Sequence, residues 1–177
     1  MSAGISANNP QRIRDASAPW QVLAREGQAV WFTNNLMVLK ATSESTGGAY
    51  GLVEALAPPG SGPPLHVHRR EDEAFWILEG DLTVRCGDQT FAAGPGSYTF
   101  LPRGIPHTFA VEGSSPARIL SVCSPGGFEQ YFVEAGQPAV GSELPPAAPV
   151  DVALLTRVGR NYNVEILGPP MAPTSSH

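Results

Sequence analysis

Short apolar runs recur along most of this chain and limit its fold more than any other feature. From Gln28 onward, runs of four to eight residues are separated by Gly, Pro, Asn or Ser. The runs are AVWF, NLMVLKA, YGLVEALA, PLHVH, EAFWILEG, LTVRC, SYTFLP, HTFAVE and RILSVC. This length and spacing are typical of strands in an all-β barrel or sandwich. The 19 Gly and 18 Pro residues supply the tight turns that such a fold needs.

The segments that flank these runs differ from them in composition and in predicted secondary structure. Residues 1–28 begin with small and polar residues, which predicts an N-terminal arm before a barrel over 29–125. Residues 126–177 predict a C-terminal helical extension packed on the barrel, so that the chain forms one domain. In this extension FEQYFVEA reads as a short helix with Gly136 at its C-cap. VALLTRVG reads as a second helix that Asp151 caps.

Charge and hydropathy exclude several classes of partner. The formal net charge is −5, and no run of five basic residues occurs, so nothing favours binding to nucleic acid. The first fifteen residues lack the apolar core of a signal peptide, and no stretch approaches 18 apolar residues. We therefore expect no membrane span and a cytoplasmic location. Cys86 and Cys123 are far apart and are expected to behave as small hydrophobic side chains.

Three of the four histidines form a pattern with one glutamate. His66 and His68 are two residues apart in an apolar run, so a strand places both imidazoles on one face. Glu73 starts the next run, after a polar loop, and can return a carboxylate to the two imidazoles. His107 follows a turn rich in Pro and Gly, residues 102–106, which can aim it inward. Together the four side chains predict a metal site.

The spacing of these residues resembles the cupin superfamily. The first cupin motif, G-x5-H-x-H-x3-4-E-x6-G, is matched by Gly60, His66, His68, Glu73 and Gly80. The second, G-x5-P-x-G-x2-H-x3-N, is matched by Gly96, Pro102, Gly104 and His107, with Val111 in place of the final Asn. The resemblance implies a cupin barrel, also called a double-stranded β-helix or jelly roll, whose ligands are His66, His68, Glu73 and His107. The alternative is a cupin with a vestigial, empty site.

Glu71 and Asp72 are rival carboxylates beside Glu73. The motif and the strand phase favour Glu73 as the ligand, and we expect Glu71 and Asp72 to decorate the loop. Three nitrogens and one oxygen suit one divalent ion of iron, nickel, manganese, cobalt, copper or zinc. Four protein ligands on an octahedral ion leave two adjacent positions open, which is typical of a catalytic site.

Aromatic and aliphatic residues of the runs are candidates for a substrate pocket. We expect them either to form an apolar slot for a flat ligand or simply to fill the barrel. The candidates are Tyr50, Phe75, Ile77, Phe100 and Phe109, with Trp76 nearby.

Among cupins, the chain resembles the single-domain bacterial quercetinases, in part through the segment GGFEQYFVEAGQPA. This resemblance implies a dioxygenase that acts with dioxygen on a flavonol-like aromatic, enol or diol, with Glu73 as both metal ligand and catalytic base. The alternatives are a metal-dependent polyketide cyclase or isomerase, and a small-ligand binder without catalysis. We also expect a homodimer, because the sheet edges and the arm need cover.

Overall fold

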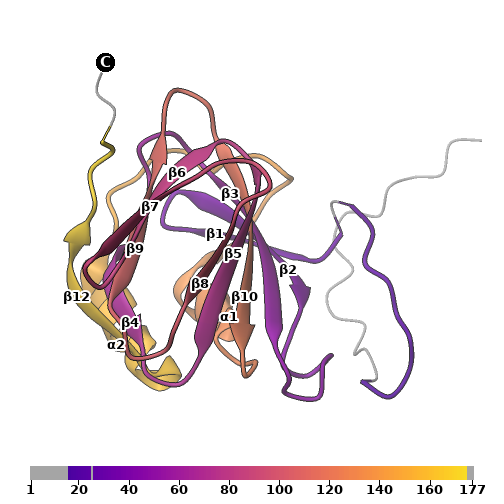
Figure 1. The fold of residues 1–177 in the computed structure, drawn as a ribbon. Helices are drawn as coiled ribbons and strands as arrows, with labels where there is room; N and C mark the ends of the chain where they lie inside the picture. Colours follow the sequence, from indigo (N-terminus) through magenta and orange to yellow (C-terminus); the bar gives the residue numbers. More distant parts are fainter. Residues whose placement is uncertain (1–15, 25, 175–177) are drawn as a thin grey trace, which may run out of the picture.

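Two antiparallel sheets face each other and enclose the core of the protein (Figure 1). The computed structural model describes residues 16–24 and 26–174. The seven-stranded sheet has the order β11-β1-β2-β3-β10-β5-β8, and the five-stranded sheet has the order β12-β4-β9-β6-β7. The strands of the first sheet are β1 (Gln28–Phe32), β2 (Asn35–Ala41), β3 (Gly51–Ala57), β5 (Asp72–Glu79), β8 (Tyr98–Leu101), β10 (Ala117–Ser124) and β11 (Gln137–Pro138). Those of the second are β4 (Pro64–His68), β6 (Asp81–Cys86), β7 (Gln89–Ala93), β9 (His107–Glu112) and β12 (Val164–Pro170).

Each of the nine apolar runs forms a strand, which confirms the all-β prediction. Burial alternates along β3, β8 and β10, because successive side chains point to opposite faces of a sheet. In β10 the inward residues are Ala117, Ile119, Ser121 and Cys123, and their neighbours are more exposed. Cys86 is half-buried and Cys123 is buried, both as free thiols.

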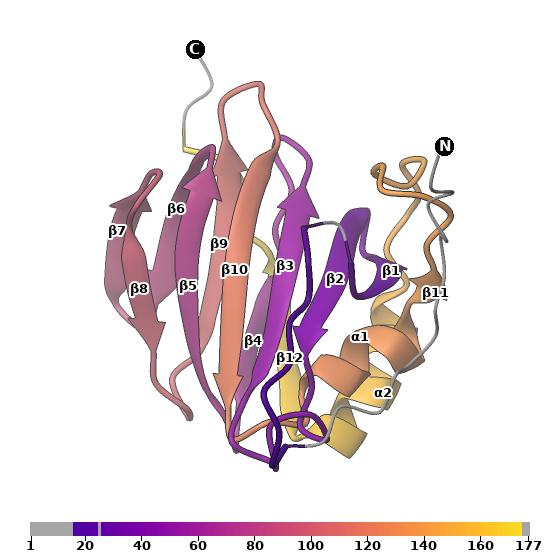
Figure 2. The same ribbon diagram turned by 90° about the vertical axis from the view of Figure 1, so that its right-hand side faces the viewer.

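Two short helices lie beside one seam between the sheets (Figure 2). Helix α1 (Glu129–Ala135) contacts β1 and β3 of the first sheet, and α2 (Val152–Gly159) contacts β12 of the second. The side chain of Asp151 accepts a hydrogen bond from the backbone N–H of Leu154, so the predicted cap of α2 forms. A 3-10 turn, η1 (Arg160–Tyr162), then leads into β12. No helix in residues 16–24 or 26–174 has both the length and the apolar character needed to cross a bilayer.

The C-terminal segment differs from the purely helical extension that the sequence predicts. Residues 164–170 form β12, which pairs with β4 and extends the second sheet beyond the strand that carries His66 and His68. Asn163, at a φ of +57°, turns the chain from η1 into this strand. Residues 164–170 are therefore part of the barrel, whereas α1 and α2 are the helices that the sequence predicts.

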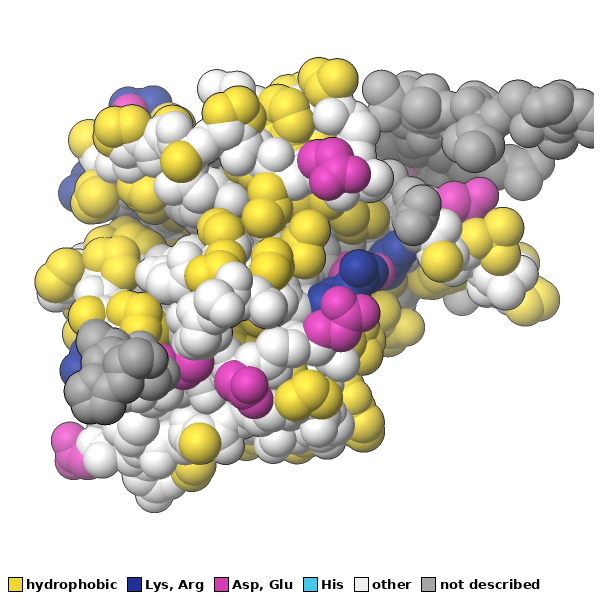
Figure 3. All heavy atoms as spheres, turned by 90° about the horizontal axis from the view of Figure 1, so that it is seen from above, with side chains coloured by type: hydrophobic (Ala, Val, Ile, Leu, Met, Phe, Trp, Pro, Cys, Tyr) yellow, Lys and Arg dark blue, Asp and Glu magenta, His cyan; other side chains and the backbone are white. Residues whose placement is uncertain are grey.

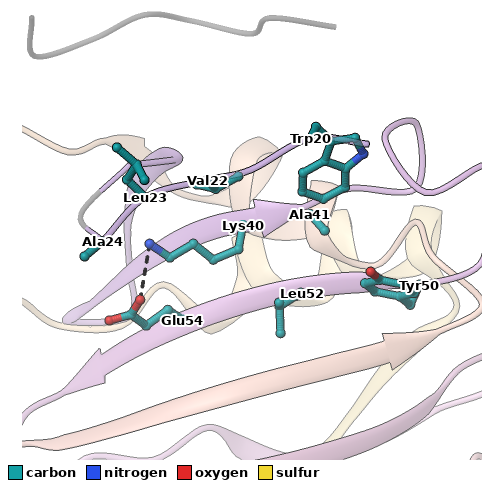
Figure 4. A pocket seen from close by; sticks show the side chains of 9 residues that line it. All are labelled: Trp20, Val22, Leu23, Ala24, Lys40, Ala41, Tyr50, Leu52 and Glu54. Atoms are coloured by element: carbon teal, nitrogen blue, oxygen red, sulfur yellow. Dashed lines mark ion pairs between the residues drawn. The ribbon is translucent and has the colours of Figure 1, made fainter. Parts of the chain in front are cut away.

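The described part of the predicted N-terminal arm packs on the barrel of the same chain. Trp20, Val22 and Leu23 face the outer side of β2 and β3 across a surface hollow of about 400 Å³ (Figure 4). Lys40 and Glu54 form an ion pair of 3.3 Å on the floor of this hollow. Residues 1–15 of the arm lie outside the described residues.

Candidate metal centre

Three strands bring the four proposed ligands together. His66 and His68 come from β4, and His107 comes from β9, where it lies directly opposite His66. Glu73 comes from β5 of the facing sheet. The four side chains are buried, and one ligand atom from each lies within 4.8 Å of the others. The predicted set thus converges in the barrel interior, and no histidine is visible on the face shown in Figure 3.

Backbone carbonyls orient two of the imidazoles. His66 donates a hydrogen bond through Nδ1 to the carbonyl of Pro64, at 2.8 Å. His107 does the same to the carbonyl of Ile105, at 3.0 Å. Because Nδ1 carries the donated proton, Nε2 of His66 presents its lone pair to a metal ion, and at His107 a metal ion would replace the proton that Nε2 shares with Glu73.

The carboxylate of Glu73 lies at the centre of this cluster. Its Oε2 atom is 3.2 Å from His107 Nε2 and 3.5 Å from His68 Nε2. Its Oε1 atom accepts a hydrogen bond of 2.6 Å from the Ser121 hydroxyl. Burial acts to raise the pKa of Glu73, but the hydrogen bond from His107 and the nearby imidazoles outweigh burial and lower that pKa to about 2.

The pKa values of His66 and His107 are shifted in opposite directions. Burial, followed by the charges of His107 and His68, lowers the pKa of His66 to about 3. Burial also acts to lower the pKa of His107, but the hydrogen bond and charge of Glu73 raise it above the ordinary value. His66 is therefore neutral at physiological pH, the state in which an imidazole binds metal.

His68 carries the strongest sign that these residues fit a metal ion. Its ring is fully buried, and neither Nδ1 nor Nε2 has a hydrogen-bond partner among the described residues. A buried polar atom without a partner costs free energy, which metal binding at Nε2 would recover. Three imidazole nitrogens and one carboxylate oxygen match the donor set of first-row divalent ions.

A narrow apolar cavity of about 80 Å³ leads away from His66 and Glu73. Phe75 and Phe109 line it and meet edge to face, with ring centroids 5.5 Å apart. The helices and β12 add another wall, made by Phe128, Tyr131, Phe132, Leu155, Val164 and Ile166. No lysine or arginine of the described residues lines the cavity, so the cavity offers no cation to an anionic ligand.

The other predicted pocket residues lie elsewhere. Ile77 is fully buried in the core but does not line the cavity. The prediction of an interior position is wrong for Phe100, which is 52% exposed, because it has the outward phase of β8. Trp76 is 50% exposed on the outward face of β5. Tyr50 lines the outer hollow shown in Figure 4 instead of the interior.

Sequence reasoning missed three residues around the ligands. Ser121 has a readable signal, because it is a polar residue in an inward position of β10. Phe128 packs edge-on against the His68 ring, with centroids 4.3 Å apart, and nothing in its local sequence indicates this contact.

Glu71 was expected to decorate the loop, but it is only 2% exposed and lies beside His68. Asp72 does lie at the surface, where it pairs with Arg103 at 2.7 Å.

Comparisons with known proteins agree with the fold and the site. Residues 53–123 match the family profile described as a cupin domain. Quercetin 2,3-dioxygenase of Bacillus subtilis is 27% identical over 135 residues, which cover 76% of this chain and 40% of that protein. Quercetin 2,3-dioxygenase of Aspergillus japonicus is 30% identical over 129 residues, which cover 69% of this chain and 37% of that protein. The chain therefore matches less than half the length of either relative.

A solved structure supports the fold independently. The crystal structure of a predicted oxalate decarboxylase from Thermotoga maritima superposes with a TM-score of 0.56 and 22% identity, over 60% of this chain and 99% of that one. At this identity the likeness concerns the fold alone. The chain therefore has the cupin fold and resembles the quercetin 2,3-dioxygenases in sequence.

Proposed function

We propose that this protein is a metal-dependent dioxygenase that acts on a flavonol-like aromatic or a related enol or diol. The observation that carries the proposal is the buried set of three imidazoles and one carboxylate beside a largely apolar cavity. The resemblance to quercetin 2,3-dioxygenases supports this choice of reaction and of dioxygen as the second substrate. A cytoplasmic location remains a prediction.

His66, His68, His107 and Glu73 would hold the ion. A divalent ion there would supply a Lewis acid that lowers the pKa of a substrate hydroxyl bound beside Glu73. Glu73 is placed to accept the proton of that hydroxyl. Ser121 holds the other oxygen of the carboxylate and fixes its orientation.

The size of the cavity constrains the substrate. At about 80 Å³ it is smaller than the several hundred Å³ usual for ligand sites. A three-ring flavonol would require Phe128 and Phe132 to move outward, since they form the wall contributed by the segment that contains α1. A compact planar enol or diol needs less displacement.

Oxygen uptake tests the proposed reaction. The purified protein, loaded in turn with iron(II), nickel, manganese, cobalt, copper and zinc, is supplied with quercetin, aromatic diols and enols in an oxygen electrode. We expect oxygen consumption with at least one pair of metal and substrate. Turnover without oxygen uptake, with zinc in the protein as isolated, would instead indicate a cyclase or isomerase.

The role of Glu73 is tested with Glu73→Gln, which keeps the size of the side chain but removes its charge and most of its basicity. If Glu73 accepts the substrate proton, the rate per bound metal should fall by about a hundredfold or more. The measurement is turnover divided by metal content from elemental analysis, and Asp72→Asn is the control because Asp72 pairs with Arg103 at the surface. Equal rates per metal in Glu73→Gln and the wild type would leave Glu73 as a ligand alone.

A further inference from the structure

Glu71 is a buried carboxylate outside the proposed ligand set. It belongs to the short loop between β4 and β5, where Arg69 and Arg70 have half-exposed side chains. Asp72, at the start of β5, also reaches the surface. Only the side chain of Glu71 turns inward from this stretch, and it is 2% exposed. A buried carboxylate is costly unless a partner compensates it, so its inward position needs an explanation.

Its buried partner is His68, the ligand side chain that lacks an orienting hydrogen bond. Glu71 Oε2 is 3.9 Å from His68 Nδ1, and both atoms are buried without a hydrogen-bond partner among the described residues. His66 and His107 each have an acceptor at their Nδ1 atoms, at 2.8 Å and 3.0 Å. Glu71 therefore stands where the third acceptor is needed.

The packing around His68 limits how its ring can move. Phe128 lies edge-on against the ring at 4.3 Å between centroids, and the His107 ring is stacked on it at 5.3 Å with an interplanar angle of 9°. These two ring contacts limit the tilt of the imidazole. A movement of about 1 Å within that plane would bring Nδ1 into hydrogen-bond range of Glu71.

We propose that Glu71 is a positioning residue, whose carboxylate accepts a hydrogen bond from His68 Nδ1 when His68 Nε2 binds the metal ion. This inference rests on the metal site of the proposed function. A carboxylate acceptor makes an imidazole a stronger ligand than a neutral carbonyl does. Glu71 and Glu73 together also place two carboxylates beside the buried site, which matches the charge of one divalent ion. Among the described residues, Arg70 lies within ion-pair distance of Glu71, at 3.7 Å, but is half-exposed, and the charge of Glu71 also helps to raise the pKa of the more distant Arg103.

Zinc affinity measures this contribution. Zn²⁺ is titrated against a chelator with the wild type, Glu71→Leu, Glu71→Gln and the control Asp72→Asn. We expect Glu71→Leu to bind Zn²⁺ about 10- to 100-fold more weakly, which is the usual effect of losing such a partner. Glu71→Gln keeps an oxygen acceptor and should lose less, and Asp72→Asn should match the wild type. A folded Glu71→Leu protein with wild-type affinity would overturn the proposal.

A spectroscopic signature separates positioning from a merely structural role and does not depend on the folding of Glu71→Leu. In ¹⁵N-labelled, Zn²⁺-loaded wild type, proton NMR should show a slowly exchanging Nδ1–H of His68, at lower field than those of His66 and His107. Glu71→Gln should shift this proton upfield, since an amide is the weaker acceptor. The absence of the His68 signal in the wild type would refute the positioning role.

The two proposals fail in different ways. If the wild type binds no divalent ion, both the metal site and the role of Glu71 are refuted. If the wild type binds Zn²⁺ and the Glu71 variants match it in affinity and spectrum, only the role of Glu71 is refuted. Suppose that the Zn²⁺-loaded protein shows the expected His68 Nδ1–H signal but no metal-loaded form consumes oxygen. This result would refute the dioxygenase activity and support the positioning role of Glu71.

Discussion

At the scale of single residues, protons and a metal ion compete for the same atoms. The Nε2 atoms of His68 and His107 both approach Glu73 Oε2, so the cluster needs positive charge between its members. In the metal-free protein only protons can supply this charge. The pKa shifts of His66 and His107 run in opposite directions because burial dominates at His66, whereas at His107 the hydrogen bond and charge of Glu73 outweigh burial.

The lowered pKa of His66 predicts how stability depends on pH in the absence of metal. The folded-state pKa, about 3, lies below the ordinary value of 6.5, so between these values the unfolded chain binds the extra proton. The contribution of His66 to the free energy of unfolding is therefore present above pH 6.5 and is lost progressively as the pH falls toward 3. The raised pKa of His107 changes the free energy of unfolding in the opposite direction as the pH falls. A variant without His66 is therefore needed to isolate the contribution of His66.

Denaturant unfolding with a chelator present, at pH values from 7.5 to 4, tests this expectation. His66→Gln should lose less stability than the wild type over this range. Asp72→Asn is the control, because Asp72 has its pKa lowered from 3.8 to about 2, mainly by hydrogen bonds from Arg103, and so titrates below the range. Parallel pH profiles for His66→Gln and the wild type would contradict the assignment.

At the scale of elements, two glycines of the cupin motifs, Gly80 and Gly104, are required for different physical reasons. Gly80, between β5 and β6, has a φ of +80°, and a Cβ atom there would lie 2.8 Å from the Ala117 Cα atom. Gly104 has the same φ, but a Cβ atom would meet nothing within 4 Å. Both positions favour glycine for the backbone, and only Gly80 also needs the space.

This difference predicts unequal costs for two similar substitutions. Gly104→Ala should cost about 1–2 kcal/mol, the penalty of a left-handed backbone with a Cβ atom. Gly80→Ala should cost about 1–3 kcal/mol more, because β10 must also shift. The midpoint of urea unfolding for the two variants and the wild type is the measurement. Equal destabilisation would show that the contact with Ala117 relaxes freely.

The elements also show which parts of the fold can be predicted from sequence. The nine runs and the four ligands are marked by local alternation and by fixed spacing, so they could be located without a structure. The strand β12 could not, because Gly168, Pro169 and Pro170 read as a connector and its partner β4 lies about a hundred residues earlier. The inward turn of Glu71 likewise depends on His68 and Phe128, and its local sequence is simply charged.

At the scale of the whole molecule, one side of the larger sheet is left uncovered by the described residues. The N-terminal segment lies over β2 and β3 (Figure 4), while β5 and the edge strand β8 present exposed aromatic side chains. Trp76 is paired with Tyr98 across the two strands, and Phe100 is close by on the same face. Large exposed apolar patches beside a free sheet edge are typical of protein interfaces.

We therefore expect two copies of the chain to associate through the aromatic surface formed by Trp76, Tyr98 and Phe100. Light scattering at micromolar concentration should give twice the 18.7 kDa mass of one chain. Tyr98→Lys should shift the protein toward the monomer, and Val140→Lys, at a position that is already 79% exposed, should not. A monomeric wild type would exclude this dimer.

The late position of α1 and β12 in the sequence has a consequence for how the proposed metal site would be loaded. The ribosome makes the chain from the N-terminus, so the four proposed ligands, residues 66 to 107, emerge before the cavity wall supplied by residues 128 to 166. While that wall is still being synthesised, a barrel formed by the preceding residues would lack this cover over its histidines. Metal loading during translation would need no opening of the finished molecule, whereas loading afterwards would have to pass Phe128 and its neighbours.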